Sequence, residues 1–194
     1  MTTFIKSVYA GFMIGVGGCV YLSVDNKIVG SLLFSFGLLT IVVQGFSLYT
    51  GKIGFVSNVK ELMTMPIIIL GNFTGTFLMA MFCKVGGLGI STEALCTKKL
   101  GCPLWSFFAL SVLCGIMMYL AIDNYRKTKN VIFIIAPVMI FILSGFEHSI
   151  ANLFYFSVAG MWNGKTILWL LVNILGNGIG AWVYGWGKEN LDLN

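Results

Sequence analysis

The chain has 194 residues, of which 58% are hydrophobic and 10% are charged, and its mean hydropathy is +0.92. Soluble domains are about 45–50% apolar and about 25% charged, so this composition excludes a soluble globular protein. The formal net charge of +5 comes from basic residues scattered through the loops, which excludes a nucleic-acid-binding patch. The composition therefore predicts a polytopic membrane protein of one domain.

Six apolar runs approach the roughly 20 residues that a helix needs to cross a bilayer. The first run follows a single basic residue, Lys6, and no small-residue cleavage site with a soluble domain follows it. We therefore interpret it as a transmembrane helix and not as a signal peptide. The six expected transmembrane helices of this all-α chain cover residues 4–24, 28–50, 64–86, 103–123, 131–161 and 166–187.

The second and fifth runs each contain an interruption. Polar or small residues are followed there by short apolar extensions, FSLYTGKIGFV (46–56) and FEHSIANLFYF (146–156). A continuous helix would not need such interruptions, and unwound backbone in a membrane is tolerated only where protein or a water-filled cavity surrounds it. We predict that the second and fifth helices are broken.

Two different motifs recur at nearly the same distance along the chain. The first pairs FSFGLLTIVVQGFSLYTG (34–51) with APVMIFILSGFEHSIANLF (136–154), and the second pairs LGNFTG (70–75) with LGNGIG (175–180). Each unit holds three spans, an odd number, so the two units must insert with opposite orientations. The pattern predicts two inverted three-helix repeats, at about 4–86 and 103–187, within one transmembrane channel domain that covers 1–194.

The basic residues are distributed unevenly between the two sets of loops. The loops on one side carry Lys52, Lys60, Arg126, Lys127 and Lys129, and those on the other carry Lys27, Lys84, Lys98, Lys99 and Lys165. Lys6 and Lys188 near the termini add to the first set. The strongest signal is the short loop 123–130, which predicts that both termini are cytoplasmic.

Cysteine and histidine usage gives little sign of a metal or cofactor. Cys96 and Cys102 flank TKKLG in a loop, and they would form a disulfide if that loop faced an oxidising compartment. The sequence leaves the reduced and bonded states open. It contains no CxxC pair, and His148 is its only histidine, so we expect no metal site and no cofactor.

The most specific motif of the chain is SGFEHSIANLF (144–154), which is joined by FSFGLLTIVVQGFSLYT (34–50) and by GN-x-x-G in the third and sixth spans. In these motifs, and along nearly its whole length, the chain resembles the formate/nitrite transporter family of anion channels. The resemblance implies an aquaporin-like protomer of six spans, a homopentamer with one pore in each protomer, and the inner (plasma) membrane of a prokaryote. Family members usually carry an amphipathic helix before the first span, whereas this chain begins almost directly with the membrane segment.

The resemblance also implies roles for individual residues. His148 matches the central pore histidine, Thr50 lies close to it, and Lys99 matches a lysine of the vestibule. Leu48 and two phenylalanines match positions of the pore constrictions. The expected substrate pathway is thus lined by His148, Thr50, Lys99, Leu48, Phe34 and Phe141.

Five further residues are expected to hold the helix breaks. Glu147 would satisfy free backbone N–H groups at the break or anchor a neighbouring protomer. The asparagines would bind the loops of the broken helices more readily than the substrate. These structural residues are Glu147, Tyr49, Asn152, Asn72 and Asn177.

These residues suit a channel for small monovalent anions of weak acids, namely formate, nitrite or hydrosulfide. Stripping water from an anion is costly, and a proton donor between two apolar constrictions would neutralise it; histidine, with an ordinary pKa of about 6.5, suits that role. The expected partners are therefore the anion, the proton and the lipid bilayer, with no nucleic acid.

Three other functions are weighed against this one. A passive channel for neutral solutes shares the architecture, but the paired NPA tripeptides of the aquaporin type are missing from the sequence. A membrane-embedded enzyme could use Glu147 and His148 as acid and base, but the chain has no second histidine. A non-transporting membrane subunit or scaffold is the third alternative. We therefore expect a transporter and not an enzyme.

Overall fold

The computed structural model describes residues 1–190, and every regular element within them is helical. The expectation of an all-α protein is confirmed. In chain order the elements are α1 (Thr2–Ser23), α2 (Lys27–Val43), α3 (Tyr49–Lys52), η1 (Ile53–Phe55), α4 (Val59–Leu62), α5 (Met65–Val85), α6 (Glu93–Gly101), α7 (Leu104–Thr128), α8 (Ile132–Leu143), α9 (Ser149–Ala159) and α10 (Gly164–Asn190).

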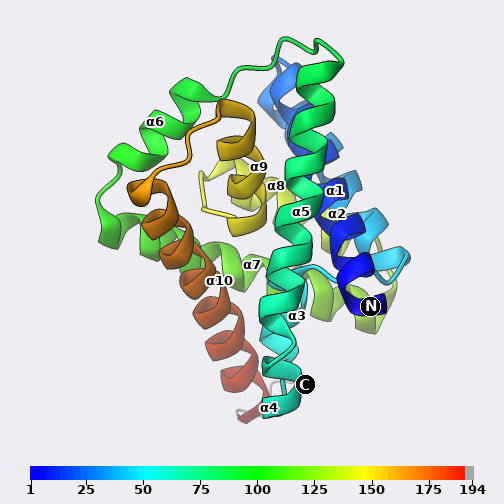
Figure 1. The fold of residues 1–194 in the computed structure, drawn as a ribbon. Helices are drawn as coiled ribbons and strands as arrows, with labels where there is room; N and C mark the ends of the chain where they lie inside the picture. Colours follow the sequence, from blue (N-terminus) through cyan, green and yellow to red (C-terminus); the bar gives the residue numbers. More distant parts are fainter. Residues whose placement is uncertain (191–194) are drawn as a thin grey trace.

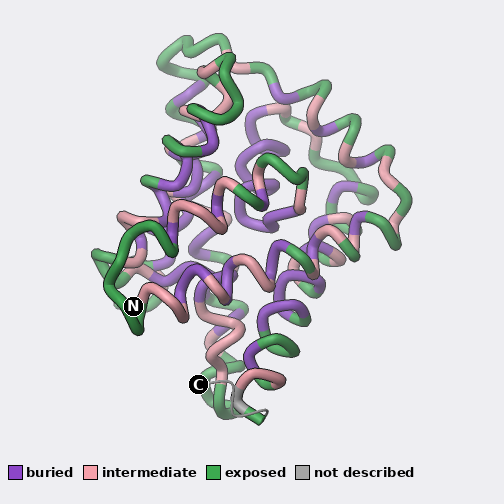
Figure 2. The backbone as a smooth tube through the Cα atoms, turned by 180° about the vertical axis from the view of Figure 1, so that it is seen from behind, coloured by how far each residue is buried: buried purple, intermediate pink, exposed green. Residues whose placement is uncertain are grey.

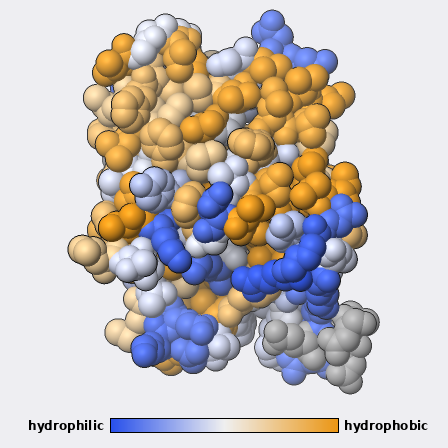
Figure 3. All heavy atoms as spheres, turned by 90° about the vertical axis from the view of Figure 1, so that its right-hand side faces the viewer, coloured by the Kyte–Doolittle hydropathy of each residue, from blue (hydrophilic) through white to orange (hydrophobic). Residues whose placement is uncertain are grey.

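Four segments of the described chain are long and apolar enough to cross a membrane. They are Thr2–Ser23, Val59–Val85, Leu104–Thr128 and Gly164–Lys188. Between them lie shorter apolar helices, α2, α8 and α9, which have 17, 12 and 11 residues. Large apolar side chains remain exposed over much of the protomer, and Figure 3 shows them as a broad hydrophobic region above a more hydrophilic lower part.

The second and fifth apolar runs are each divided by a turn. α2 and α8 end two residues before a glycine in left-handed backbone, Gly45 with φ 66° and Gly145 with φ 71°. In both turns the N–H of the next residue donates to a helix carbonyl five positions earlier, at 2.9 Å. Glycine adopts this backbone without the penalty of a Cβ, which explains why both helices end there.

The short helix α9 lies at the centre of the fold. Its residues from Ser149 to Val158 are all buried. Figure 1 shows α9 surrounded by α5, α6, α7 and α10, and Figure 2 shows from behind the buried backbone inside the ring of outer helices. The FEHSIAN segment is therefore enclosed by protein on all sides, so its polar groups do not face lipid.

Two pairs of long helices pack closely enough to require glycine. A Cβ at Gly75 on α5 would lie 2.0 Å from the carbonyl oxygen of Val8 on α1. A Cβ at Gly180 on α10 would likewise lie 2.0 Å from the carbonyl oxygen of Val112 on α7. Small residues let membrane helices approach to backbone contact, and these contacts fix α1 on α5 and α7 on α10.

The segment before α7 differs from its prediction. Residues 93–101 form helix α6, although the sequence was interpreted there as a loop. Cys96 and Leu100 are one turn apart and buried, and the Thr92 hydroxyl donates to the carbonyl of Tyr155 on α9 at 2.8 Å. The helix is thus stabilised by contact with α9, which a local pattern does not reveal. Cys96 and Cys102 are both free thiols. The sequence left a disulfide and two reduced cysteines as alternatives, and the structure has the reduced cysteines.

Candidate functional site

His148 is the last residue of the turn between α8 and α9 and caps the amino terminus of α9. Its Nδ1 accepts the N–H of Ala151 at 3.1 Å, and its Nε2 lies 3.0 Å from the hydroxyl oxygen of Thr50. A ring nitrogen that accepts an N–H carries no proton, so the neutral ring holds its hydrogen on Nε2 and donates it to Thr50. Only 2% of the His148 surface is exposed.

An aromatic stack continues from the histidine. Phe141 lies parallel to the imidazole, with ring centroids 5.4 Å apart, and Phe34 meets Phe141 edge-on at 6.1 Å. Both phenylalanines are buried, as is Leu48, two residues before Thr50. The structure thus brings together five of the six residues expected along the substrate pathway.

A cavity of about 270 Å³ opens on the side of Leu48 away from the helix α6. Leu38, Ile41, Leu48 and Ile122 form apolar parts of its wall. Leu38 was not singled out in the sequence, although it lies one turn from Phe34 on α2 and therefore on the same helix face. The cavity ends against the buried side chain of Leu48, which separates it from His148.

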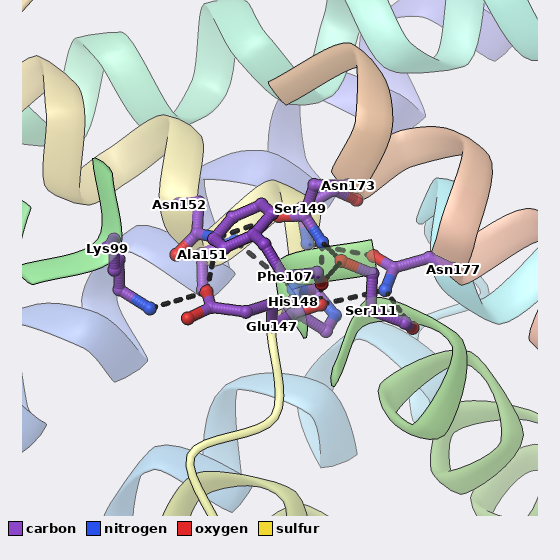
Figure 4. Close-up of polar contacts among 10 residues, drawn as sticks. All are labelled: Lys99, Phe107, Ser111, Glu147, His148, Ser149, Ala151, Asn152, Asn173 and Asn177. Carbon is purple, nitrogen blue, oxygen red and sulfur yellow. Dashed lines mark hydrogen bonds and ion pairs between the residues drawn. The ribbon is translucent and has the colours of Figure 1, made fainter. Parts of the chain in front are cut away.

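The sixth pathway residue, Lys99, lies on the other side and is engaged by Glu147. Its ammonium is 2.6 Å from Glu147 Oε2, and the exposed fractions of the two side chains are 13% and 8%. The amide nitrogen of Asn152 donates to the same oxygen at 2.8 Å. Figure 4 shows Lys99 reaching Glu147 from α6, with Asn152 beside them.

The expectation that the Glu147 carboxylate binds free backbone N–H groups is wrong for the described chain. Those groups already have partners, because Asn177 accepts the N–H of Ser149 and His148 accepts that of Ala151. The carboxylate is therefore left to pair with Lys99. At the break itself, the backbone carbonyl of Glu147 accepts from Asn173 and Asn177, while its side chain binds Lys99 and Asn152.

Asn177 on α10 binds the break before α9. Its Oδ1 accepts the N–H of Ser149 at 2.8 Å, and its amide nitrogen donates to the carbonyl oxygens of Glu147 and Ser111, both at 2.8 Å. It thereby satisfies groups on both sides of His148 that have no helical partner. These contacts fix the position of the histidine relative to α7 and α10.

Asn72 on α5 makes the corresponding contacts in the first half of the chain. Its Oδ1 accepts the N–H of Tyr49 at 2.9 Å, and its amide nitrogen donates to the carbonyls of Ser7 at 2.8 Å and Ser47 at 2.9 Å. The Tyr49 hydroxyl adds a bond of 2.9 Å to the carbonyl of Ile174 on α10. Asn72 therefore holds the turn before α3 as Asn177 holds the turn before α9.

Three polar residues beside the break were missed in the sequence. Asn173 donates to the carbonyl of Glu147 at 2.7 Å and to the Ser111 hydroxyl at 2.9 Å, and its Oδ1 accepts from Asn152 at 2.7 Å. Its spacing of four residues from Asn177 was the available signal, because such residues share a helix face. The hydroxyl of Ser149 is buried and has no hydrogen-bond partner among the described residues.

Comparison with protein families gives a match over almost the whole chain. The family model described as formate/nitrite transporter matches residues 1–187. Among curated proteins, the chain is 28% identical to the formate channel FocA of Haemophilus influenzae, 26% to the formate channel FocB of Escherichia coli and 27% to the nitrite transporter NirC of Escherichia coli. These alignments cover 66%, 79% and 96% of this chain, but 52%, 65% and 84% of the respective relatives.

Solved structures match the fold over the same extent. A pentameric formate channel with formate bound has a TM-score of 0.85 at 23% identity, covering 100% of this chain and 97% of that one. An FNT family ion channel has a TM-score of 0.82 at 23% identity, covering 97% and 88%. These relatives are channels and transporters, not enzymes. The chain belongs to the formate/nitrite transporter family, which confirms the resemblance found in its sequence.

Proposed function

We propose that this protein is a transmembrane channel for small monovalent anions of weak acids, with formate, nitrite and hydrosulfide as its substrate class. His148 protonates the anion between two apolar constrictions, one at Leu48 and one at Phe34 and Phe141. The observation that carries this proposal is the hydrogen bond of 3.0 Å between His148 Nε2 and Thr50, both of them buried, next to the aromatic ring of Phe141. The names of the relatives, formate channels and a nitrite transporter, agree with this substrate class.

The proposed proton transfer uses two states of the imidazole. In the neutral state Nδ1 accepts from Ala151, so the ring has no second proton to give. To become imidazolium, the ring must turn away from Ala151 and take a proton on Nδ1, which gives up a hydrogen bond worth about 1 kcal/mol. The imidazolium then passes its Nε2 proton to an oxygen of formate or nitrite, or to the sulfur of hydrosulfide, which leaves a neutral ring with its hydrogen on Nδ1. A proton from water in the pore then binds Nε2 and restores the imidazolium for the next anion. The neutral acid crosses the next constriction and releases its proton to water beyond it.

The proposed architecture is a pair of inverted three-helix repeats. It is supported by the equivalent hydrogen bonds of Asn72 and Asn177 and by the left-handed glycines Gly45 and Gly145. The half-helices α3 and α9 then point their amino termini, the positive ends of their dipoles, at the pore centre, which favours an anion there. We further propose a homopentamer in the plasma membrane of a prokaryote with cytoplasmic termini, on the strength of the pentameric relative and the basic loop 123–130.

Flux into proteoliposomes tests the proposed function. The purified chain is reconstituted, and uptake of formate, nitrite and hydrosulfide is measured at pH 5.5 and 7.5 beside protein-free vesicles and a neutral solute such as glycerol. We expect at least one of the anions to enter faster than in protein-free vesicles, with little glycerol entry. Glycerol uptake without anion uptake would instead favour the neutral-solute channel.

A further inference from the structure

The cavity outside Leu48 combines an apolar wall with basic side chains. Lys52, Arg126 and Lys129 contribute to its lining, and they come from the end of α3 and from the end of α7 and the residue after it. The volume of about 270 Å³ exceeds the roughly 30 Å³ that one water occupies in the liquid, so a small anion fits there with several waters. The cavity is thus a hydrated chamber directly before the Leu48 constriction.

The positive charge of this chamber is not neutralised by ion pairs within the described residues. No carboxylate among them forms an ion pair with Lys52, Arg126 or Lys129. Glu61 shares a neighbouring cavity with Lys52 and Arg126, but its carboxylate accepts the N–H of Ser57 at 3.0 Å. Three basic residues therefore line a small volume with a partly apolar wall, an arrangement that concentrates anions, although Lys52 and Arg126 also line the neighbouring cavity.

Two of these side chains are held in place. The Arg126 guanidinium lies over the Phe55 ring, 4.1 Å from its centroid, which covers one face of the fork and leaves its N–H edges for an anion. Lys52 is partly buried, and desolvation lowers its pKa; the charges of Lys6 and Arg126 lower it further, and that of Glu61 raises it.

The opposite side of the pore has a different charge arrangement. Lys99 precedes α7 and Arg126 lies near its other end, and a helix of 25 residues is about 37 Å long. The Lys99 ammonium is paired with Glu147 at 2.6 Å, so much of its field is cancelled at short range. Asp123, near the chamber, is likewise occupied, because Lys127 and Lys188 both pair with it.

We propose that Lys52 and Arg126, with Lys129 at the rim, form a binding site for a small monovalent oxyanion such as formate or nitrite, and that this site makes the channel asymmetric. The guanidinium fork matches the two oxygens of a carboxylate or of nitrite, and Lys52 adds a point charge toward Leu48. The site fills with anions from the side of loop 123–130. Anions therefore reach the Leu48 constriction from this side at a lower bulk concentration than is needed on the α6 side. The identity of the bound anion, formate or nitrite, rests on the proposed function. The positive charge of the chamber is independent of it.

The charge is tested without any transport. A reporter cysteine is placed on the chamber wall as Val42→Cys in a Cys102→Ser background, since the other four native cysteines are buried. Its reaction rates with the anionic sulfonatoethyl and the cationic trimethylammonioethyl methanethiosulfonates are compared. We expect the anionic-to-cationic rate ratio to fall about tenfold in Lys52→Gln/Arg126→Gln and to stay unchanged in the control Lys60→Gln, an exposed lysine outside the chamber.

Binding is tested on the same reporter by adding formate or nitrite. Either anion should slow the anionic reagent in the parent reporter and have a smaller effect in Lys52→Gln/Arg126→Gln. An unchanged rate ratio in the double variant, or equal slowing in both proteins, would overturn the site. If formate or nitrite slows the anionic reagent as expected but the protein transports no anion, the binding site is supported and the proposed function is rejected.

Asymmetry is then measured as uptake of labelled formate into proteoliposomes that hold protein of known orientation. The half-saturating formate concentration should be lower, by about threefold or more, on the side of loop 123–130 than on the α6 side. Lys52→Gln/Arg126→Gln should bring the two values together, and Lys60→Gln should not. Equal half-saturation on both sides of the wild-type channel would contradict the proposal.

Discussion

At the scale of single residues, the site joins one titratable ring to hydrogen-bond partners in an apolar surrounding. His148 uses both ring nitrogens, one on the backbone of α9 and one on Thr50, and its face packs against Phe141. These contacts fix the position of the ring. The proposed proton transfer therefore requires the ring to turn away from Ala151 as well as to take up a proton.

Phe34 should limit the size of the anion. Removing its buried ring in Phe34→Ala leaves a gap beside Phe141, so we expect acetate and lactate flux to rise about tenfold relative to formate. The matched control is Phe36→Ala, because Phe36 lies on the same helix but is 63% exposed on the outer face. Competition uptake of labelled anions in proteoliposomes gives the ratio. Equal ratios in both variants would place the constriction elsewhere.

Lys52 should make the charge of the chamber sensitive to alkaline pH. Burial lowers its pKa, so its positive charge is lost at a lower pH than that of an ordinary lysine. The preference of the Val42→Cys reporter for the anionic reagent should therefore decline between pH 7.5 and 9.5. In Lys52→Arg the preference should persist, since a guanidinium stays charged, whereas Lys60→Arg should decline like the parent. The same decline in Lys52→Arg would exclude Lys52 as the cause.

Most of the central residues were predictable from the sequence, and the basic chamber was not. The FEHSIAN motif and the repeat singled out His148 and Thr50, which the structure brings into contact. Lys52 and Arg126 were counted only as topology charges, because they lie in different loops and no local pattern shows that those loops share a cavity. Asn173 was overlooked for a similar reason, since it lies outside the repeated GN-x-x-G motif.

At the scale of elements, the two turns between half-helices are the most heavily bonded parts of the fold. Each is closed by a left-handed glycine and held by asparagines from a long helix, Asn72 at the first turn and both Asn173 and Asn177 at the second. The carbonyl and N–H groups of the turns have no helical partners. They bind side chains in place of water, which allows polar backbone to lie inside a membrane protein. The turns could be predicted from the sequence. Helix α6 could not, because α6 is stabilised by its contact with α9.

Replacing Asn177 should destabilise the turn that holds His148. Asn177→Leu leaves the Ser149 N–H without its partner and removes one hydrogen bond each from the carbonyls of Glu147 and Ser111, and an unsatisfied buried group costs about 1–3 kcal/mol. We therefore expect a loss of about 1–3 kcal/mol in the free energy of unfolding, seen as a lower Tm in detergent, together with reduced anion flux.

Asn190→Leu is the matched control, since Asn190 lies exposed at the end of the same helix and bonds only within it. Its Tm should stay close to that of the wild type. A Tm for Asn177→Leu within error of the control would mean that Asn177 does not hold the turn.

At the scale of the whole molecule, the described fold is a ring of long helices around buried half-helices, and its outer surface is rich in exposed apolar side chains. Such a surface requires lipid or further protein chains to cover it. The sequence predicted the all-helical class, because apolar length is a strong signal, and the described chain has four helices long enough to cross a membrane with three shorter apolar helices. It did not show which outer faces meet other chains.

The proposed homopentamer should be visible in solution. Native mass spectrometry of the detergent-solubilised protein should give five copies of the 21.2 kDa chain. Each protomer encloses its own His148, so a mixture of wild-type and His148→Asn chains should lose flux in proportion to the mutant fraction. A steeper loss would indicate that the protomers do not conduct independently, and a monomer or dimer mass would contradict the pentamer.

The proton-transfer step at His148 is tested most directly by the pH dependence of formate flux in His148→Asn. Wild-type proteoliposomes, corrected for protein-free vesicles, should take up formate faster at pH 5.5 than at pH 7.5, because imidazolium forms more readily in acid. Asparagine keeps a polar side chain at the break but does not titrate, so the variant should lose most of the flux and the remaining flux should not rise in acid. Transport by His148→Asn at the wild-type rate, with unchanged pH dependence, would contradict the account.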